Sequence, residues 1–138
     1  MANYCSNMLN IKGDVVSIEE FYAENLIQKN NDEKTLIFSN VSPEPEYENK
    51  EDWYAWRNEN WGTKWEPETY NVGVAEDKSY MYIDFETAWS PPIQWLEKAT
   101  IKYPNLTFTL DYREDGMGFK GKAKASKGVL SNKVKEIN

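Results

Sequence analysis

The strongest constraint on the fold is a strict alternation of apolar and polar residues between positions 106 and 113. Every second position is apolar, and the apolar residues are Leu106, Phe108, Leu110 and Tyr112. Because successive side chains of a strand point to opposite faces of a sheet, this pattern predicts a strand with one buried face. A turn signal at Asp115-Gly116 and a second alternation over 119–125 predict its antiparallel neighbour. The chain is therefore expected to form an antiparallel sheet that is covered on one face.

Two segments with helical spacing predict the helices that cover this face. The first begins at a capping box of Ser17 and Glu20, in which each side chain satisfies a free amide of the first turn. The second is capped by Ser90, has Pro91 in its first position and ends before Pro104. Further strands are expected at 3–12, 35–38, 70–74 and 80–85. This order predicts an α+β fold: a ferredoxin-like split βαβ antiparallel sheet with two helices on one face and an extra hairpin strand.

Residues 43–66 interrupt this plan after the second expected strand. An acidic loop broken by prolines leads into a short helix with several tryptophans on one stripe, and Gly62 is suited to end that helix. We interpret 43–66 as a Trp-rich helical insertion within a single domain that spans 1–138. Residues 126–138 are expected to form a polar C-terminal segment, either a short strand, a frayed helix or a tail.

The residue counts exclude several kinds of active site. The chain has 138 residues, which suits one domain, with no histidine and one cysteine. It therefore cannot supply a Ser-His-Asp triad, a Cys-His pair, an internal disulfide or a Cys-rich metal site. We expect no metal site and no cofactor. Cys5 lies in a strand pattern and is expected to be a small core residue.

The charge is strongly uneven along the chain. Lys and Arg total 16 and Asp and Glu total 23, so the net charge is −7, which argues against a nucleic-acid partner. Yet residues 116–138 hold six lysines, at 120, 122, 124, 127, 133 and 135, and one carboxylate, Glu136. The start of the chain lacks the pattern of a signal peptide, and no apolar run approaches the ~20 residues of a membrane span. We expect a cytoplasmic protein, in the host cell, with no membrane partner.

Four segments together carry a family resemblance. They are residues 3–7 (NYCSN), 58–65 (NENWGTKW), 85–92 (FETAWSPP) and 112–121 (YREDGMGFKG). In this order they resemble the YubB ferredoxin-like family, whose members include Api-type proteins of phages and plasmids. The resemblance covers about residues 2–125 and implies a ferredoxin-like domain of a phage, prophage or plasmid. It implies no reaction and no catalytic residue, because the family has no established activity.

The candidate binding residues lie in the insertion and in these segments. They are Trp53, Trp56, Arg57, Asn60, Trp61, Thr63, Lys64, Trp65, Asp84, Trp89 and Met117. Exposed indoles beside Arg57 or Lys64 would suit a flat or cationic ligand, or a peptide. The alternative is structural: the insertion has no core of its own, and its indoles anchor it to the sheet. Asp84 and Glu86 project from the same strand face, as acid–base chemistry with two carboxylates would require.

Three functions remain open at this point. The leading one is a non-catalytic binding module of a phage or plasmid that acts on a macromolecular partner, a host or phage protein, as a monomer or homodimer. One alternative is a carboxylate-based enzyme with a small-ligand pocket at the Trp-rich insertion. The other is an acidic mimic of nucleic acid or a binder of single-stranded RNA. RNA binding would require Tyr80 or Tyr82, together with Lys122, to be exposed on one sheet face. Otherwise, Lys120, Lys122 and Lys124 are expected to protect an edge strand.

Overall fold

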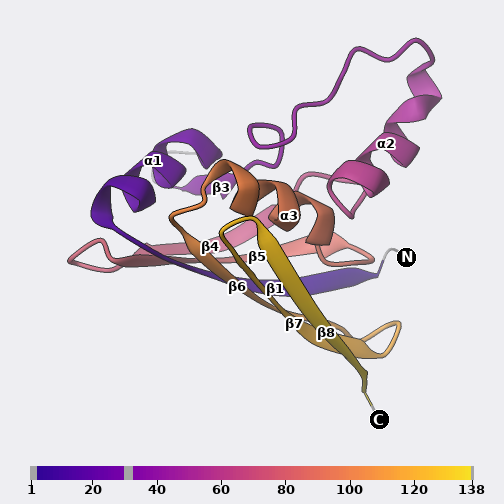
Figure 1. Ribbon diagram of the computed structural model, residues 1–138. Helices are drawn as coiled ribbons and strands as arrows, with labels where there is room; N and C mark the ends of the chain where they lie inside the picture. Colours follow the sequence, from indigo (N-terminus) through magenta and orange to yellow (C-terminus); the bar gives the residue numbers. More distant parts are fainter. Residues whose placement is uncertain (1–2, 30–32, 138) are drawn as a thin grey trace.

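The computed structural model describes residues 3–29 and 33–137 (Figure 1). The elements along the chain are β1 (Tyr4–Lys12), α1 (Val15–Asn25), β2 (Leu26–Gln28), β3 (Lys34–Leu36), the 3-10 helix η1 (Lys50–Asp52), α2 (Trp53–Asn60), β4 (Glu68–Val74), β5 (Tyr80–Ala88), α3 (Ile93–Lys102), β6 (Thr107–Glu114), β7 (Phe119–Ser126) and β8 (Val129–Glu136). Within the described residues, one antiparallel sheet has the order β4-β5-β1-β6-β7-β8, and β2 pairs with β3 in a separate small sheet.

The main sheet contains two interleaved βαβ units. The chain passes from β1 through α1 to β4, and β5 lies between these two strands in the sheet. It then passes from β5 through α3 to β6, and β1 lies between those two. This interleaving is the split βαβ arrangement, so the expected α+β class and antiparallel sheet are confirmed. Strands β7 and β8 extend the sheet beyond β6.

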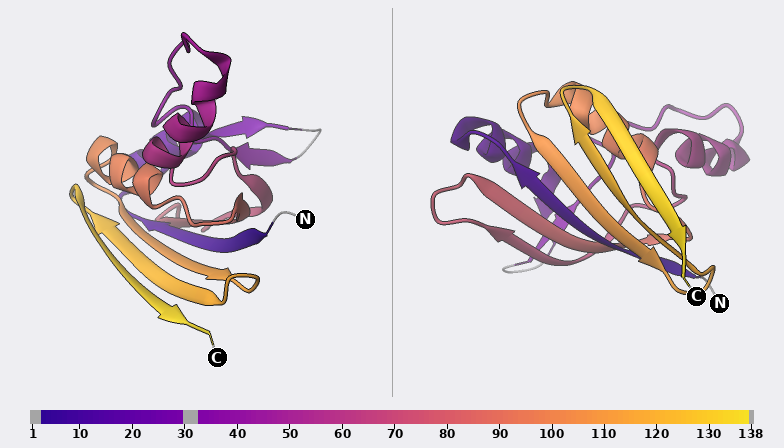
Figure 2. Two further views of the ribbon diagram at one scale, coloured as in Figure 1. Left: turned by 90° about the vertical axis from the view of Figure 1, so that its right-hand side faces the viewer. Right: turned by 60° about the horizontal axis from the view of Figure 1, so that its bottom comes forward.

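Helices α1 and α3 lie on the same face of the sheet (Figures 1 and 2). The alternating apolar residues of the strands face them: Leu9, Ile83 and Leu110 are at most 1% exposed. Phe21 of α1 meets Phe108 of β6 edge to face, with ring centroids 5.7 Å apart. Each such buried side chain contributes roughly 1.5–3 kcal/mol of transfer free energy, so this interface holds the helices on the sheet.

The other face of the sheet carries no helix in the part of the chain that the structure describes (Figure 1). We name it the open face. It receives the alternate residues of the same strands, as the exposed–buried alternation of β1 from Tyr4 to Lys12 shows. Residues that pair across strands share a face, so the open face is organised in rows. One such row is Tyr82–Asn10–Thr109–Lys124–Ser131.

The sequence misplaced the second strand of the sheet. The strand expected at 35–38 is β3, which covers Lys34–Leu36 and pairs with β2 away from the main sheet. The second strand of the split βαβ plan is β4, so the Trp-rich segment precedes that strand instead of following it. The additional strands are β7 and β8 at the C-terminal end. A short apolar run such as 35–38 has the same pattern in a main sheet and in a two-stranded side sheet.

Two helix starts also differ from the expected ones. The carboxylate of Asp14, not the predicted box of Ser17 and Glu20, caps α1: it accepts the Ser17 amide at 3.1 Å and the Ser17 hydroxyl at 2.7 Å. These hydrogen bonds lower the pKa of Asp14. Helix α3 begins at Ile93, and Ser90 caps nothing, because its hydroxyl donates to the Gly62 carbonyl at 2.5 Å. No helix within residues 3–29 and 33–137 is long and apolar enough to cross a membrane.

The C-terminal segment forms a strand because of the turn that precedes it. Ser126 pairs with Val129, and the two residues between them, Lys127 and Gly128, have φ values of 53° and 80°. Positive φ at both central positions is the geometry of the type I′ hairpin turn, whose twist matches that of the strands. The Gly128 amide also donates to the Thr100 hydroxyl of α3 at 3.1 Å. The last strand is therefore held at its turn by α3.

The pairing of β7 with β8 depends on the small size of Gly121. A Cβ at this position would lie 2.3 Å from the Tyr112 hydroxyl and 2.6 Å from the Lys133 carbonyl oxygen. We expect Gly121→Ala to lower the free energy of unfolding by about 1–3 kcal/mol, because the backbone of β8 would have to shift. Urea unfolding followed by circular dichroism measures this, with Lys124→Ala on the exposed side of the same strand as the control. Equal stability of the two variants would contradict the packing described.

Candidate functional site

Two tryptophans of the insertion serve as anchors. Trp61 is fully buried, its ring centroid lies 5.7 Å from that of Phe38, and its Nε1 donates to the Ser42 carbonyl at 2.9 Å. Trp56 packs edge to face on Trp61 at 5.8 Å. Trp95 of α3 completes the cluster, 5.0 Å from Phe38. These rings attach the segment around α2 to the core, which is the structural role considered from the sequence.

The polar residues beside these rings are bonded within the protein. The Arg57 guanidinium lies over Trp53 and Trp61, at 5.2 and 5.0 Å from the ring centroids. It donates to both carboxylate oxygens of Glu44, at 2.8 and 3.0 Å, and these hydrogen bonds lower the pKa of Glu44. Asn60 accepts from the Lys98 ammonium at 2.5 Å. Arg57 and Asn60 therefore stabilise the insertion and are already occupied.

Three of the four segments that carry the family resemblance, 3–7, 58–65 and 85–92, meet at one junction. Thr63, fully buried, donates its hydroxyl to the Ala88 carbonyl at 2.9 Å, and the Trp89 amide donates to the Asn3 carbonyl at 2.9 Å. Gly62 has a φ of 88°, and a Cβ there would meet the Pro91 carbonyl at 3.0 Å. These residues thus join the end of α2 to the start of α3 and to β1. This structural role accounts for the residue types of these segments without a ligand.

Two indoles at the junction remain exposed. Trp65 and Trp89 have exposed fractions of 41% and 48%, and the Lys64 ammonium lies 4.5 Å and 5.5 Å from their ring centroids. We name Trp65 and Trp89 the indole pair. A ligand cation would have to displace Lys64 from the rings, because the ammonium already occupies the cation–π position.

Trp89 also has an unusual backbone. Its φ is 72°, in the left-handed region that costs a residue with a Cβ roughly 1–2 kcal/mol. The surroundings hold it there, since the Ser90 amide donates to the Ala88 carbonyl at 2.8 Å and the Thr87 hydroxyl to the Ser90 carbonyl at 2.6 Å. The bend turns the chain from β5 towards α3.

Two candidates lie away from the insertion. Asp84 projects from β5 onto the open face, between Asn71 and Met8, whereas Trp61 belongs to the core on the other side of the sheet. Met117 is 59% exposed in the turn between β6 and β7, where its amide donates to the Glu114 carboxylate at 2.6 Å. The enzyme hypothesis requires Asp84 to lie at the Trp-rich insertion, and the structure does not bring the two together. Among the described residues, no cluster of acidic and cysteine side chains is suited to hold a metal ion.

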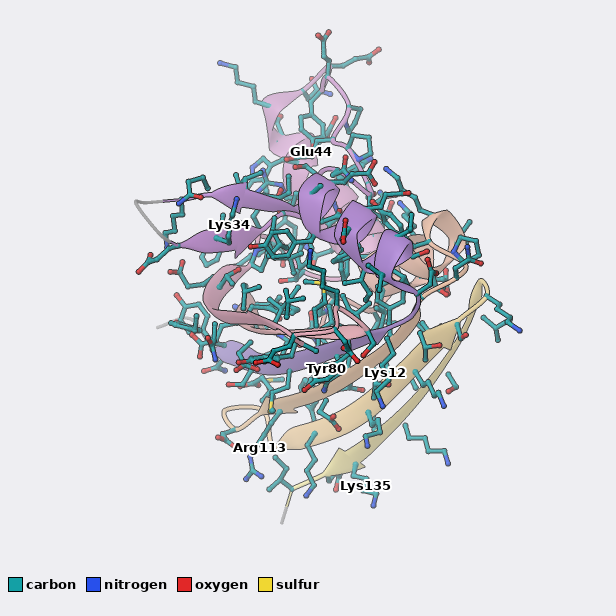
Figure 3. The ribbon with its side chains drawn as sticks, turned by 90° about the vertical axis from the view of Figure 1, so that its left-hand side faces the viewer. Lys12, Lys34, Glu44, Tyr80, Arg113 and Lys135 are labelled. Carbon is teal, nitrogen blue, oxygen red and sulfur yellow. The ribbon has the colours of Figure 1, made fainter. Side chains whose placement is uncertain are left out.

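A cluster of positive charge lies on the open face over β6, β7 and β8. Six cationic side chains of these strands share this face, and we name them the basic face: Arg113, Lys120, Lys122, Lys124, Lys133 and Lys135. Figure 3 shows Arg113 and Lys135 on the far side of the sheet from Lys34 and Glu44. Most of these side chains line a groove of about 420 Å³, in which Asp111 is the acidic lining residue and pairs with Lys122 at 3.6 Å.

A second groove of about 410 Å³ lies between the small sheet and β4. Its cations already have partners: Lys29 pairs with Glu68 at 3.4 Å, and Lys34 lies 5.9 Å from the ring centroid of Tyr22. Because Glu33 and Glu68 balance these two lysines in the lining, this groove is close to neutral, whereas the groove of the basic face keeps an excess of positive charge. The comparison favours the basic face as a site for an anion.

Sequence reasoning missed the part of the basic face that β8 supplies, for a specific reason. It expected β7 to be an edge strand whose lysines prevent sheet-to-sheet pairing, and this was wrong because β8 pairs along its whole length. Because the sequence did not decide whether 126–138 forms a strand, it could not assign Lys133 and Lys135 to a face of the sheet. The signal in the sequence was the Lys127-Gly128 pair between two segments of strand-like residues, which is compatible with a two-residue hairpin turn.

Comparison with known proteins agrees with the fold. Residues 60–136 match the family model described as the ferredoxin-like domain in Api92-like protein. The chain belongs to this family. The narrower name YubB stays a prediction from the sequence. A crystal structure of a protein api92 from Yersinia pseudotuberculosis superposes with a TM-score of 0.66, over 100% of this chain and 99% of that one, at 10% identity. At that identity the likeness shows the fold alone, and no curated protein matches the chain.

The strain at Trp89 can be isolated by comparing two variants. We expect Trp89→Gly to be more stable than Trp89→Ala by about 1 kcal/mol, because only glycine adopts a positive φ without cost. Both variants remove the indole, so the difference reports the backbone alone. Urea unfolding at neutral pH measures it. A more stable alanine variant would contradict the left-handed conformation.

Cys5 is expected to be chemically inert in the folded protein. It is fully buried, and burial raises the pKa of its thiol to about 12. Near pH 8 we expect Ellman's reagent to react with the native protein about a thousandfold more slowly than with the chain in urea, since only the thiolate reacts. Immediate reaction of the native thiol would show that β1 opens at its N-terminal end.

Proposed function

We propose that this chain is a non-catalytic binding module that holds an anionic macromolecular partner on the open face of its sheet. The observation that supports this most directly is the basic face, where six cations of three neighbouring strands share one surface with Asp111. Opposite charge on two surfaces steers their association and selects the partner. In line with the family resemblance, the module would serve a phage or plasmid in the cytoplasm of its host.

The other candidate sites support this proposal less. At the indole pair, Lys64 already occupies the space a cation would need. Arg57 is bound to Glu44 on two atoms, so it offers no free charge. The enzyme alternative needs free carboxylates at the Trp-rich insertion. Asp84 projects from the opposite face of the sheet, and the carboxylates of Glu44 and Glu66 accept hydrogen bonds from Arg57 and from backbone amides.

Binding to immobilised heparin tests the proposal. Heparin is a polyanion without bases, so it reports the basic face alone. We expect the wild-type chain to be retained at low ionic strength and near neutral pH despite its net charge of −7. The fourfold variant Lys120→Gln, Lys122→Gln, Lys133→Gln, Lys135→Gln should pass through unretained.

A matched variant controls for net charge. Lys29→Gln, Lys50→Gln, Lys78→Gln, Lys102→Gln removes four exposed lysines elsewhere, so both variants change the net charge from −7 to −11. This control should be retained like the wild type. If the two variants elute together, or if the wild type is not retained, the proposal is wrong.

A further inference from the structure

We infer that the anionic partner is a single strand of nucleic acid whose bases stack on two tyrosines of β5 and whose backbone lies on the basic face. This inference rests on the proposed function and names its partner. It departs from the expectation that net charge excludes nucleic acid, because the charges are segregated: the cations gather on β6, β7 and β8, while Asp84 and Glu86 lie on β5.

The tyrosines form a platform on the same face as the lysines. Tyr80 and Tyr82 are 43% and 37% exposed, and they are two residues apart on β5, so they project from one face about 7 Å apart. Lys122 is on this face too, with 64% of its side chain exposed. RNA binding was expected to require a tyrosine of this strand and Lys122 to be exposed on the same face. The geometry meets this condition.

The ring of Tyr82 is held over the sheet. It lies across Gly73 of β4, where an added Cβ would come within 2.2 Å of the ring. One side of the ring therefore contacts the backbone of β4, and the ring is also partly exposed to solvent. A ring fixed in this way loses little conformational entropy when a base stacks on it, and base–aromatic stacking accepts any sequence.

The rows of the open face connect the tyrosines to the lysines. From Tyr82 the row continues through Asn10 and Thr109 to Lys124, three strand spacings or roughly 14 Å away. Asn10 and Thr109 are partly exposed and can exchange hydrogen bonds with bases or sugars. A strand that runs diagonally from Tyr80 and Tyr82 to the groove of the basic face also avoids Glu86, whose carboxylate accepts the Tyr70 hydroxyl at 2.5 Å.

A single strand fits this surface better than a duplex or an acidic protein. In a duplex the faces of the bases are covered by their neighbours, so the tyrosines would have nothing to stack on. An acidic segment of protein would use the lysines and leave the rings without a partner. The split βαβ sheet of RNA-recognition domains likewise stacks bases on exposed aromatic residues of its strands.

The test uses fluorescence anisotropy of labelled oligonucleotides at low salt. The probes are a short single-stranded RNA of mixed sequence, the same sequence as single-stranded DNA, and its duplex. We expect the single strands to bind and the duplex to bind at least tenfold more weakly. Tyr82→Ala should weaken binding of the single strands about tenfold, whereas Tyr82→Phe should retain it, because stacking needs the ring and not the hydroxyl.

Two further variants separate positioning from charge. Gly73→Ala leaves Tyr82 in the sequence but displaces its ring, so it should weaken single-strand binding while heparin retention stays unchanged; its fold is checked by circular dichroism. The variant Lys122→Gln, Lys133→Gln should make binding less dependent on salt, since fewer counterions are released.

The outcomes separate the inference from the proposed function. Equal binding of duplex and single strand, or no effect of Tyr82→Ala, overturns the inference while heparin retention still supports the basic face. Binding of polyglutamate but of no oligonucleotide also overturns it and favours an acidic protein as the partner. Loss of retention on heparin, with no oligonucleotide bound, overturns the proposed function as well.

Discussion

Burial of one face of the sheet against α1 and α3 is the interaction on which the rest of the structure depends. It fixes the register of every strand, since a slip of one residue would move Leu9, Ile83 and Leu110 from the core to solvent. It also decides which residues face outward. The tyrosines of β5 and the lysines of β7 share the open face because their neighbours in the sequence are needed in the core. The candidate site is thus a direct result of how the core is built.

The sequence predicted those parts of the fold that depend on local pattern. The alternation at 106–113 and the turn at Asp115-Gly116 identified β6 and β7, and the helical spacing identified α1 and α3. Pairings between distant segments were harder: the run at 35–38 has the composition of a sheet strand but pairs locally with β2. The sequence also could not show whether Trp61 anchors the insertion or binds a ligand, because a tryptophan has the same spacing along the helix in both roles. Exposure separates them, and exposure depends on the tertiary structure.

The net charge of the chain does not describe the charge of its open face. Charges in physiological salt are screened over about 8 Å, so a bound chain responds to the nearby side chains more than to the total. Here an acidic molecule presents a basic surface because the pairing of β7 with β8 places Lys135 beside Lys120 and Lys133 beside Lys122. That concentration exists only once β8 has formed. The excess of lysines after residue 116 is visible in the sequence, but the surface on which they meet is not.

The central position of β1 in the sheet has a consequence for the synthesis of the chain. Its partners are β5, which ends at Ala88, and β6, which ends at Glu114. Of the strands of this sheet, β1 therefore leaves the ribosome first, and its apolar side chains stay without their partner strands until β5 and β6 have been translated. Strands β6, β7 and β8 are joined by short turns and can pair among themselves as they emerge. We therefore expect the insertion of β1 between β5 and β6 to be a late step of folding, and the apolar side chains of β1 to be open to aggregation before it.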